Sequence, residues 1–525
     1  MLLQKNVESR LMARLYERSD KKDGENRFIK IPAIPTGFNV FDIYGGFLAE
    51  DMFGRQVLNG GLYPRLSNVI GESSTGKTSW VIRSNARAVD YIQQKFGQGY
   101  SEMFFYDSED HTPDIRLMRL ANWSPADFMN RCNYTNKRIS LLQLYNQIVQ
   151  FYDIKTKYKK DFLLPSGIRG IDGKEVLFIA PTFVCVDSVA SVLTEGFESL
   201  VETDRAGEIK EAEALSNNID AMREAKAWTV FTKKCKPFLD EANICLTMIN
   251  HKTKEQKMSM FDQEKRYLPF LKPGEKLKGG AENIYQSFHV LDFYSGEKLN
   301  EKNPVYGSEI DGFVTRVQFV KSKSNVEGVS FPMVFEKLNG YNPKLSDFEY
   351  LWQNKYGFTG VGKMVLDVLP EISFTRKTLL DTMEEHPALA RALSFTTRFK
   401  AAHAMLYYKD APQLTDMGNL PLNERLAMIY AYTNPYDYND FSSASSEYER
   451  VARQHRNLIT FDMTSDLGQN LLQKHDLDSF KDGYLLSNED GVTPYDLETN
   501  TRDGQYFYSS SVWKQMQEEQ KTLAS

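Results

Sequence analysis

Apolar and polar residues along most of this chain follow two periods, one typical of strands and one typical of helices. Between residues 45 and 338, short runs rich in Val, Ile, Phe and Leu are separated by longer stretches with helical periodicity. The strand-like runs are 66–70, 103–106, 183–186, 244–249, 288–293 and 314–320. Strands that alternate with helices in this way predict an α/β fold built on a central, mostly parallel sheet.

The pattern changes at both ends of this region. Residues 1–18 place charges and leucines at amphipathic spacing, which predicts a helix within an N-terminal oligomerisation segment, 1–40. After Tyr350 the periodicity is helical, as in 379–399, and predicts a mainly helical C-terminal domain. We therefore expect a core at 41–350, a helical domain at 351–440 and an extension at 441–525. The extension is rich in Asp, Asn, Ser and Gly, and part of it is expected to be flexible.

The composition narrows the class of protein. A chain of 525 residues exceeds one compact core, and a hydrophobic content of 41% is ordinary for a globular protein. No stretch approaches the roughly 20 apolar residues of a membrane helix, so we expect no membrane partner. The formal net charge of −6 means that any contact with nucleic acid must be local. Four scattered cysteines indicate a reducing cytoplasm and no structural zinc: Cys132, Cys185, Cys235 and Cys245.

A glycine-rich segment between a predicted strand and a predicted helix has the pattern of a phosphate-binding loop. Glycines let the backbone bend so that successive amide groups converge on phosphate oxygens, and the following helix adds the positive end of its dipole. Lys77 then contacts the β- and γ-phosphates, and Thr78 is a ligand for Mg²⁺. The segment predicts a site for ATP and Mg²⁺ formed by Gly71, Glu72, Ser73, Ser74, Thr75, Gly76, Lys77, Thr78 and Ser79. A chance Gly-Lys turn is the alternative.

Two carboxylates follow neighbouring predicted strands. Asp187 ends the apolar run 183–186 and is the candidate second anchor for Mg²⁺, although an acid in this position often caps a helix. Glu109 follows the run 103–106 and is the candidate for activating water; a solvated loop acid is the alternative. Ligands gather at the carboxyl edge of open α/β sheets, which is where both acids are expected.

Taken in order, these motifs resemble the RecA strand-exchange family, and most closely its phage branch, the UvsX-like recombinases. The segment 34–42 resembles the lead into the family's core, and 107–109 resembles the segment with the catalytic glutamate. His251 resembles the residue that senses the γ-phosphate, although the family's main branch has a glutamine there, and 278–280 resembles the close of the second DNA loop. The resemblance implies a RecA-like ATPase core, with Glu109, Lys77 and His251 as catalytic residues.

Two alternating lysines lie on the last predicted strand of the core. Lys321 and Lys323 resemble the family lysines that reach across a subunit interface to a neighbour's phosphates. The resemblance then implies a helical filament with ATP bound between protomers. Alternating lysines on a solvated strand edge are the other interpretation.

The segment 252–278 carries the most basic local charge near these motifs, with eight basic residues against four acidic ones. Its aromatic side chains allow bases to stack while lysines pair with phosphates, a combination suited to single-stranded DNA of any sequence. The candidate DNA-binding residues are Lys252, Lys254, Lys257, Phe261, Lys265, Arg266, Tyr267, Phe270, Lys278, Gly279 and Gly280. A solvated insertion is the alternative. A second loop, 194–217, is a weaker candidate because its charge is mixed.

The resemblance implies an ATP-dependent recombinase that forms filaments on single-stranded DNA and pairs it with homologous double-stranded DNA in recombination, repair and replication. It also implies a recombination mediator and a single-strand-binding protein as partners, in the cytoplasm of a bacterial or phage-infected cell. A replicative helicase with the same fold is the first alternative. A filament scaffold that binds ATP with little hydrolysis is the second, and a water-activating Glu109 argues against it.

Overall fold

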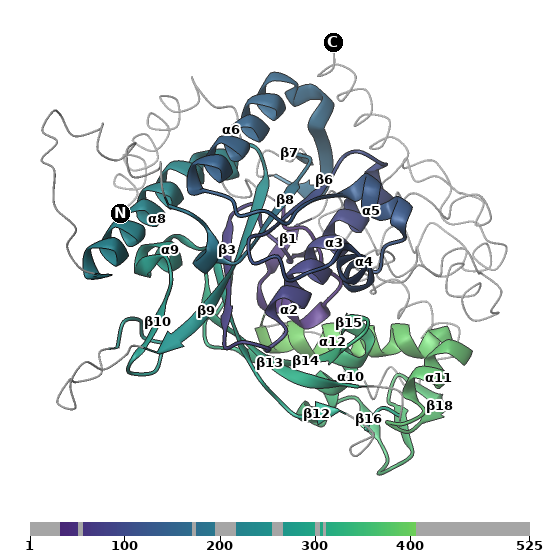
Figure 1. Ribbon diagram of the computed structural model, residues 1–525. Helices are drawn as coiled ribbons and strands as arrows, with labels where there is room; N and C mark the ends of the chain where they lie inside the picture. Colours follow the sequence, from purple (N-terminus) through teal and green to yellow (C-terminus); the bar gives the residue numbers. More distant parts are fainter. Residues whose placement is uncertain are drawn as a thin grey trace, which may run out of the picture.

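The computed structural model of the protein describes residues 32–50, 56–170, 175–194, 217–254, 266–299, 305–307 and 311–405. The described part is a mixed α/β fold with a large sheet at its centre, which confirms the predicted fold class at this level (Figure 1). In spatial order, the sheet runs β15 (Gly340–Asn342), β14 (Ser330–Glu336), β13 (Gly312–Ser322), β11 (His289–Tyr294), β3 (Leu66–Gly71), β9 (Ile244–Lys254), β8 (Thr182–Asp187), β4 (Met103–Asp107) and β5 (Cys132–Thr135).

The sheet has a parallel part and an antiparallel part. From β11 through β3, β9, β8 and β4 to β5, every pair is parallel. From β11 through β13 and β14 to β15, every pair is antiparallel. β10 (Glu275–Leu277) pairs with the far end of β9, and β12 (Lys298–Leu299) pairs with β13. The parallel strands end at one edge, so the segments that follow them meet there.

Helices cover both faces of the parallel part because its strands bury both faces. Along β8, Phe183 and Cys185 belong to one hydrophobic core, whereas Val184 and Val186 belong to another. The first core includes α2 (Asn39–Tyr44), α3 (Lys77–Phe96) and α4 (Asp114–Ala121). The second includes α6 (Leu141–Lys157) and α8 (Asn217–Glu241). The near-continuous apolar runs of the sequence reflect this two-sided burial.

The remaining elements are smaller. They are β1 (Phe47–Glu50), β2 (Gln56–Asn59), α5 (Pro125–Arg131), β6 (Leu163–Arg169), β7 (Glu175–Ile179), α9 (Gly280–Gln286) and the 3-10 helices η1 (Lys159–Phe162) and η2 (Val189–Ser191). β1 pairs with β2, and β6 pairs with β7, in two separate antiparallel hairpins.

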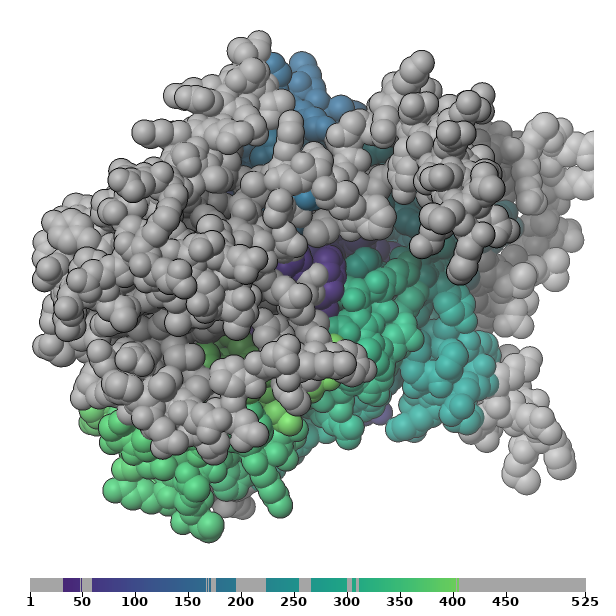
Figure 2. All heavy atoms as spheres, turned by 180° about the vertical axis from the view of Figure 1, so that it is seen from behind, coloured from purple at the N-terminus to yellow at the C-terminus, as the bar shows by residue number. Residues whose placement is uncertain are grey.

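The C-terminal part of the described chain packs on the core. The predicted helical pattern corresponds to α10 (Pro343–Asn354), α11 (Leu379–Glu385) and α12 (Pro387–Met405), but a three-stranded sheet lies among them. That sheet consists of β16 (Phe358–Thr359), β17 (Met364–Leu366) and β18 (Leu369–Phe374). Asn39 of α2 donates hydrogen bonds to Asp347 of α10 at 2.7 Å and Ser394 of α12 at 2.9 Å. Seen from behind, these green elements continue the surface of the teal-green strands (Figure 2).

The expected segment boundaries can now be compared with the structure. The boundary predicted near residue 350 falls inside α10, whose buried residues share one hydrophobic core with the sheet. Most of the predicted N-terminal segment and the whole C-terminal extension lie outside the described residues. Among the described helices, none is long and apolar enough to cross a membrane.

Candidate active site

The loop between β3 and α3 requires glycine at its first and last positions. Gly71 has φ 153°, and a Cβ there would lie 2.6 Å from the Phe293 carbonyl oxygen. Gly76 caps α3 in the left-handed region with φ 86°, and a Cβ there would lie 2.4 Å from the Tyr341 hydroxyl. A side chain at either position is therefore strained or clashes, and the loop keeps one tight path over the start of α3.

Lys77 is the buried cation of this loop. Its ammonium donates to the backbone oxygen of Glu72 at 2.5 Å, across the loop. Burial lowers the pKa of Lys77 to about 8, although the carboxylates of Asp187 and Glu109 favour the charged form. The amine is therefore mostly protonated at neutral pH, and it is held by a carbonyl that an anionic oxygen can replace.

The other loop residues divide into an exposed rim and a buried base. Glu72, Ser73 and Ser74 are exposed, and Thr75 and Ser79 are buried. The Thr75 hydroxyl donates to the Glu72 backbone oxygen at 2.9 Å, which stabilises the turn. The rim thus exposes its main chain directly before the positive end of a 20-residue helix, an arrangement that favours a bound anion.

Thr78, in the first turn of α3, is in contact with Asp187 at the end of β8. The Thr78 hydroxyl donates to Asp187 Oδ2 at 2.6 Å, which joins the first turn of α3 to the end of β8. Burial raises the pKa of Asp187 to about 6, against the lowering effect of the Thr78 hydrogen bond; the carboxylates of Glu109 and Asp107 raise it further. A hydroxyl beside a carboxylate fits Mg²⁺, which prefers oxygen ligands and retains several waters. Mg²⁺ held at these oxygens would supply positive charge to neutralise a phosphate.

Glu109 lies just beyond β4, in a loop held by the buried Asp107. The Asp107 carboxylate accepts the backbone N–H groups of Glu109 at 3.2 Å, His111 at 3.0 Å and Thr112 at 2.7 Å. Ser188, which follows Asp187, donates a hydrogen bond to Glu109 Oε1. Burial acts to raise the pKa of Glu109, but hydrogen bonds from Ser188 and His111 lower it below its usual value. Glu109 is thus ionised at neutral pH and fixed in place, as a base that orients water must be.

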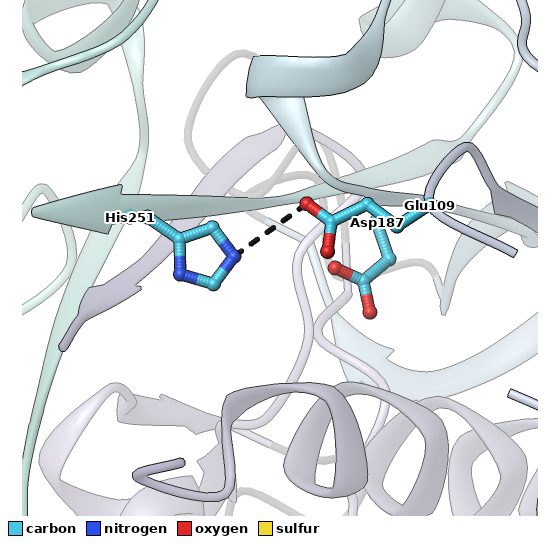
Figure 3. Close-up of side chains that lie close together, drawn as sticks. All are labelled: Glu109, Asp187 and His251. Carbon is cyan, nitrogen blue, oxygen red and sulfur yellow. Dashed lines mark ion pairs between the residues drawn. The ribbon is translucent and has the colours of Figure 1, made fainter. Parts of the chain in front are cut away.

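His251 completes the cluster from β9, the strand between β3 and β8. Its Nε2 lies 3.8 Å from Glu109 Oε1 (Figure 3). Burial and the Lys77 ammonium lower the pKa of His251, so that the imidazole is neutral at neutral pH. Ligand atoms of Glu109, Asp187 and His251 all lie within 4.8 Å of one another, so these residues are also a possible cation site. The imidazole can instead donate one hydrogen bond to an oxygen beside Glu109.

The predicted DNA segment begins directly after His251, as a hairpin of β9 and β10. Asn250 fixes its two limbs together: its amide nitrogen donates to the Lys278 backbone oxygen at 2.8 Å, and its oxygen accepts the Lys278 N–H at 3.3 Å. The return limb is anchored by Leu268 and Leu271, which are buried in a small apolar cluster with Ile70 of β3. The hairpin thus extends from the same edge of the sheet as the candidate active site (Figure 1).

The candidate DNA residues fall into three groups. Those exposed on or near the hairpin are Lys254, Arg266, Tyr267 and Lys278, with Phe270 half-buried. Those committed to internal contacts are Lys252, in a buried ion pair with Asp292, and Gly279 and Gly280, where a Cβ would meet Trp228 at 3.1 Å and Ala225 at 3.0 Å. Those outside the described residues are Lys257, Phe261 and Lys265. The second group therefore has packing roles that argue against contact with DNA.

Lys321 and Lys323 are not part of this cluster. The strand β13 is antiparallel to β11, and Ser322 pairs with His289, which in turn pairs with Ser67 near the start of β3. The Lys323 N–H donates to the Phe288 oxygen, and the Phe288 N–H donates to the Leu66 oxygen. Five residue positions separate Leu66 from Gly71, or about 16 Å along a strand. The two lysines thus lie toward the opposite edge of the sheet from the loop of their own chain.

Three residues of the site were missed in the sequence. Asp107 and Ser188 fix Glu109, and Asp292 pairs with Lys252. Asp107 and Ser188 lie at or next to the ends of apolar runs, beside the two candidate acids, and that position was a usable signal. Nothing in the sequence pairs Asp292 with Lys252, 40 residues away.

Two comparisons of the chain with known proteins found no relative. No protein-family model matches the chain. A search of curated proteins also finds no match. The residues and their geometry are therefore the basis for assigning a function.

Proposed function

We propose that this protein is a DNA-dependent ATPase of the RecA strand-exchange type, which forms filaments on single-stranded DNA and pairs it with homologous duplex. The observation that carries the proposal is the meeting of Lys77, Thr78, Asp187, Glu109 and His251 at one sheet edge. The set supplies a cation and main-chain groups for phosphates, a hydroxyl and carboxylate for Mg²⁺, and an ionised base for water.

The hairpin supports the DNA-dependent part of the proposal. His251 is followed without a break by the limb that carries the exposed Lys254, and the return limb carries the exposed Arg266 and Tyr267. A cationic hairpin with aromatic side chains suits single strands, because the phosphates do not depend on sequence and every base has a face that can stack on an aromatic ring. Its direct attachment to the candidate γ-phosphate contact supports a link between ATP and DNA.

The position of Lys321 and Lys323 supports a site shared between copies of the chain. The described carboxyl edge holds three carboxylates, Asp107, Glu109 and Asp187, near the ammonium of Lys77, and the neighbouring ammonium of Lys252 is already paired with Asp292. ATP adds further negative charge, and Mg²⁺ offsets only part of it. Two lysines that are out of reach of their own loop are available to a neighbouring copy's phosphates, as in a filament.

The test is ATP hydrolysis by the purified protein with and without single-stranded DNA, alongside electron micrographs of the same mixtures. Stimulated hydrolysis with helical filaments supports the proposal. Stimulated hydrolysis with closed rings, together with unwinding of a forked duplex, favours the helicase. Filaments with bound ATP and negligible turnover favour the scaffold. Absence of ATP binding overturns all three.

The hairpin is tested through the salt dependence of binding. Replacing Lys254, Lys257, Lys265 and Arg266 by glutamine is expected to lower the slope of log affinity against log salt by about 0.7 for each phosphate that the protein no longer neutralises. A matched control removes four exposed lysines elsewhere: Lys157, Lys160, Lys355 and Lys363. The control changes net charge equally, so an identical effect in both variants would remove the hairpin from the DNA path.

A further inference from the structure

Beyond His251, the outgoing limb of the β9–β10 hairpin leaves the central sheet. The pairing of β9 with β3 ends at His251 opposite Gly71, and its pairing with β8 ends earlier, at Met248. Residues 252–254 of β9 then pair only with β10 among the described strands. A two-stranded ribbon joined to a sheet by one strand bends easily at the joint. The return limb is held by Leu268 and Leu271, and something other than the backbone ladder must therefore fix the direction of the outgoing limb.

Lys252, the first residue beyond that joint, supplies such a contact. Its ammonium lies 2.5 Å from Asp292 Oδ2 of β11, and the two side chains are 8% and 0% exposed. Since β3 lies between β9 and β11, this ion pair passes over the end of β3, next to the point where the glycine-rich loop begins. The ammonium also lies 4.8 Å from the centre of the Tyr294 ring, which covers it.

The alternation of side chains along β9 places His251 and Lys252 on opposite faces of the sheet. His251 faces Glu109, on the side of the candidate nucleotide site. Lys252 shares a face with Asn250, which fixes the return limb at Lys278, and with Ile70, which is paired in register with both Asn250 and Asp292. Because His251 and Lys252 are adjacent in β9, a shift of the main chain at His251 acts directly on Lys252 and its ion pair with Asp292.

A buried pair of this kind is not explained by stability alone. Replacing such pairs with apolar residues is often neutral or stabilising, because removing two charges from water costs about as much as their attraction returns. What the pair adds is a defined geometry. It also lies close enough to Lys77 to act on its charge, since Asp292 favours the protonated form of Lys77 and Lys252 opposes it.

We propose that Lys252 and Asp292 are a positioning pair, which holds the outgoing limb of the hairpin against β11 so that occupation of the loop by nucleotide is transmitted to the hairpin. The inference rests on the proposed function and adds the means by which ATP and DNA binding are linked. With the pair intact, displacement at His251 rotates the hairpin as a unit. Without the pair, the chain bends at residues 251–252 and the displacement does not reach the hairpin.

The experiment follows hydrogen exchange in the full-length protein, with and without a non-hydrolysable ATP analogue and Mg²⁺. In the wild type, the analogue is expected to slow exchange both in the loop, 71–79, and in the hairpin limbs, 250–254 and 275–278. In Lys252→Met, the loop is still protected, but the nucleotide-linked protection of the limbs falls by about fivefold or more. Lys252→Arg keeps the charge and is expected to restore protection of the limbs. Lys276→Met removes an exposed charge from the same hairpin and serves as the control.

Removing one partner leaves a buried charge, and Lys252→Met is at risk of misfolding for that reason. The paired variant Lys252→Met/Asp292→Leu leaves neither charge and provides a second test with the same expected loss in the limbs. A hairpin that remains protected by nucleotide in the paired variant overturns the positioning role. Wild-type protection of the loop without the limbs also overturns it, while leaving the nucleotide site intact. Protection in neither place overturns the proposed function itself, and the inference with it.

Discussion

The two edges of the central sheet differ in how their charged side chains are partnered. At the carboxyl edge, side chains from α3, β9, the end of β8 and the segments just after β4 and β8 contact one another within a single, partly buried cluster. Toward the other edge, Lys321 donates to the backbone oxygens of Ile284 and Tyr285 at the end of α9, and Lys323 is exposed. The side chains of the first set contact one another within one chain. The second is a pair of cations near which the described chain places backbone carbonyls, the Tyr285 ring and a few acidic side chains, but none of the cluster residues.

The difference is informative because the cluster at the carboxyl edge contains more carboxylates than cations. Burial holds the pKa of Asp187 high and that of Lys77 low, which shows that each charge in the site is costly in lost hydration. Among the described residues near this cluster, the ammonium of Lys252 is already paired with Asp292, and the exposed cations of this edge, such as Lys254, belong to the hairpin. A polyanionic ligand in the cluster is therefore better neutralised with additional cations. The comparison therefore predicts that activity depends on both edges, with one edge contributed by a second copy.

The largest expected effect is at the carboxyl edge itself. Lys77→Ala removes the ammonium that the glycine-rich loop itself contributes, and ATP turnover should fall by about a thousandfold. The measurement is steady-state phosphate release with saturating single-stranded DNA. Lys363→Ala, an exposed lysine of the C-terminal part, should leave turnover unchanged. Turnover near the wild-type rate in Lys77→Ala would mean that the glycine-rich loop is not part of the active site. The contrast between the two edges would then lose its basis.

The next effect separates chemistry from binding at the same edge. Glu109→Gln keeps the shape of the side chain but cannot accept a proton, so hydrolysis should fall by about a hundredfold while ATP binding and filament assembly persist. Binding is measured with a fluorescent ATP analogue, and assembly by electron microscopy. Asp110→Asn changes the neighbouring carboxylate at a left-handed position that asparagine tolerates, and it serves as the control. Loss of ATP binding in Glu109→Gln would instead mean that the residue is structural.

The carboxyl edge was largely predictable from the sequence because local pattern determines it. Apolar runs end in Asp107, Asp187 and His251, and in a parallel sheet such ends must meet. The glycine-rich loop likewise lies between a strand and a helix, as its pattern predicts. The mixed α/β fold follows from the same alternation of strands and helices, and it is confirmed.

What the sequence did not predict depends on contacts between distant residues. Lys252 lies in a basic run, and only the fold shows that its charge is neutralised by Asp292 beneath the hairpin. Gly279 and Gly280 resembled part of a DNA loop, whereas their lack of side chains lets the start of α9 pack on Trp228 and Ala225. The strands β16 and β17 are two and three residues long, too short for an alternating pattern to be recognised, and the six residues of β18 do not alternate between buried and exposed positions.

The opposite edge is tested by mixing two impaired proteins. Lys321→Ala/Lys323→Ala should lower turnover by about tenfold, the decrease expected for charged hydrogen bonds to phosphate. If these lysines act on a neighbour, a mixture with Lys77→Ala should exceed the average activity of its parts, because some interfaces then combine an intact loop with intact lysines. If they act within their own chain, the mixture shows only that average. The result decides directly whether the two edges form one site through assembly. Lys363→Ala in place of the double variant controls for dilution of Lys77→Ala by active chains.

The smallest effect concerns protons at the carboxyl edge, where burial raises the pKa of Asp187 to about 6. Above that pH the carboxylate is free to bind Mg²⁺, and below it a proton competes with the metal, so Mg²⁺-dependent binding of ATP should weaken as the pH falls from 7 to 5. The nucleotide titrates in the same range, and Asp187→Asn, which has no such proton, corrects for it. The affinity advantage of the wild type over this variant should therefore shrink severalfold across the range, approaching tenfold per pH unit below 6. An advantage that is constant with pH would show that Asp187 is not the group that exchanges a proton for Mg²⁺, and the metal would then have to be assigned to other oxygens of this edge.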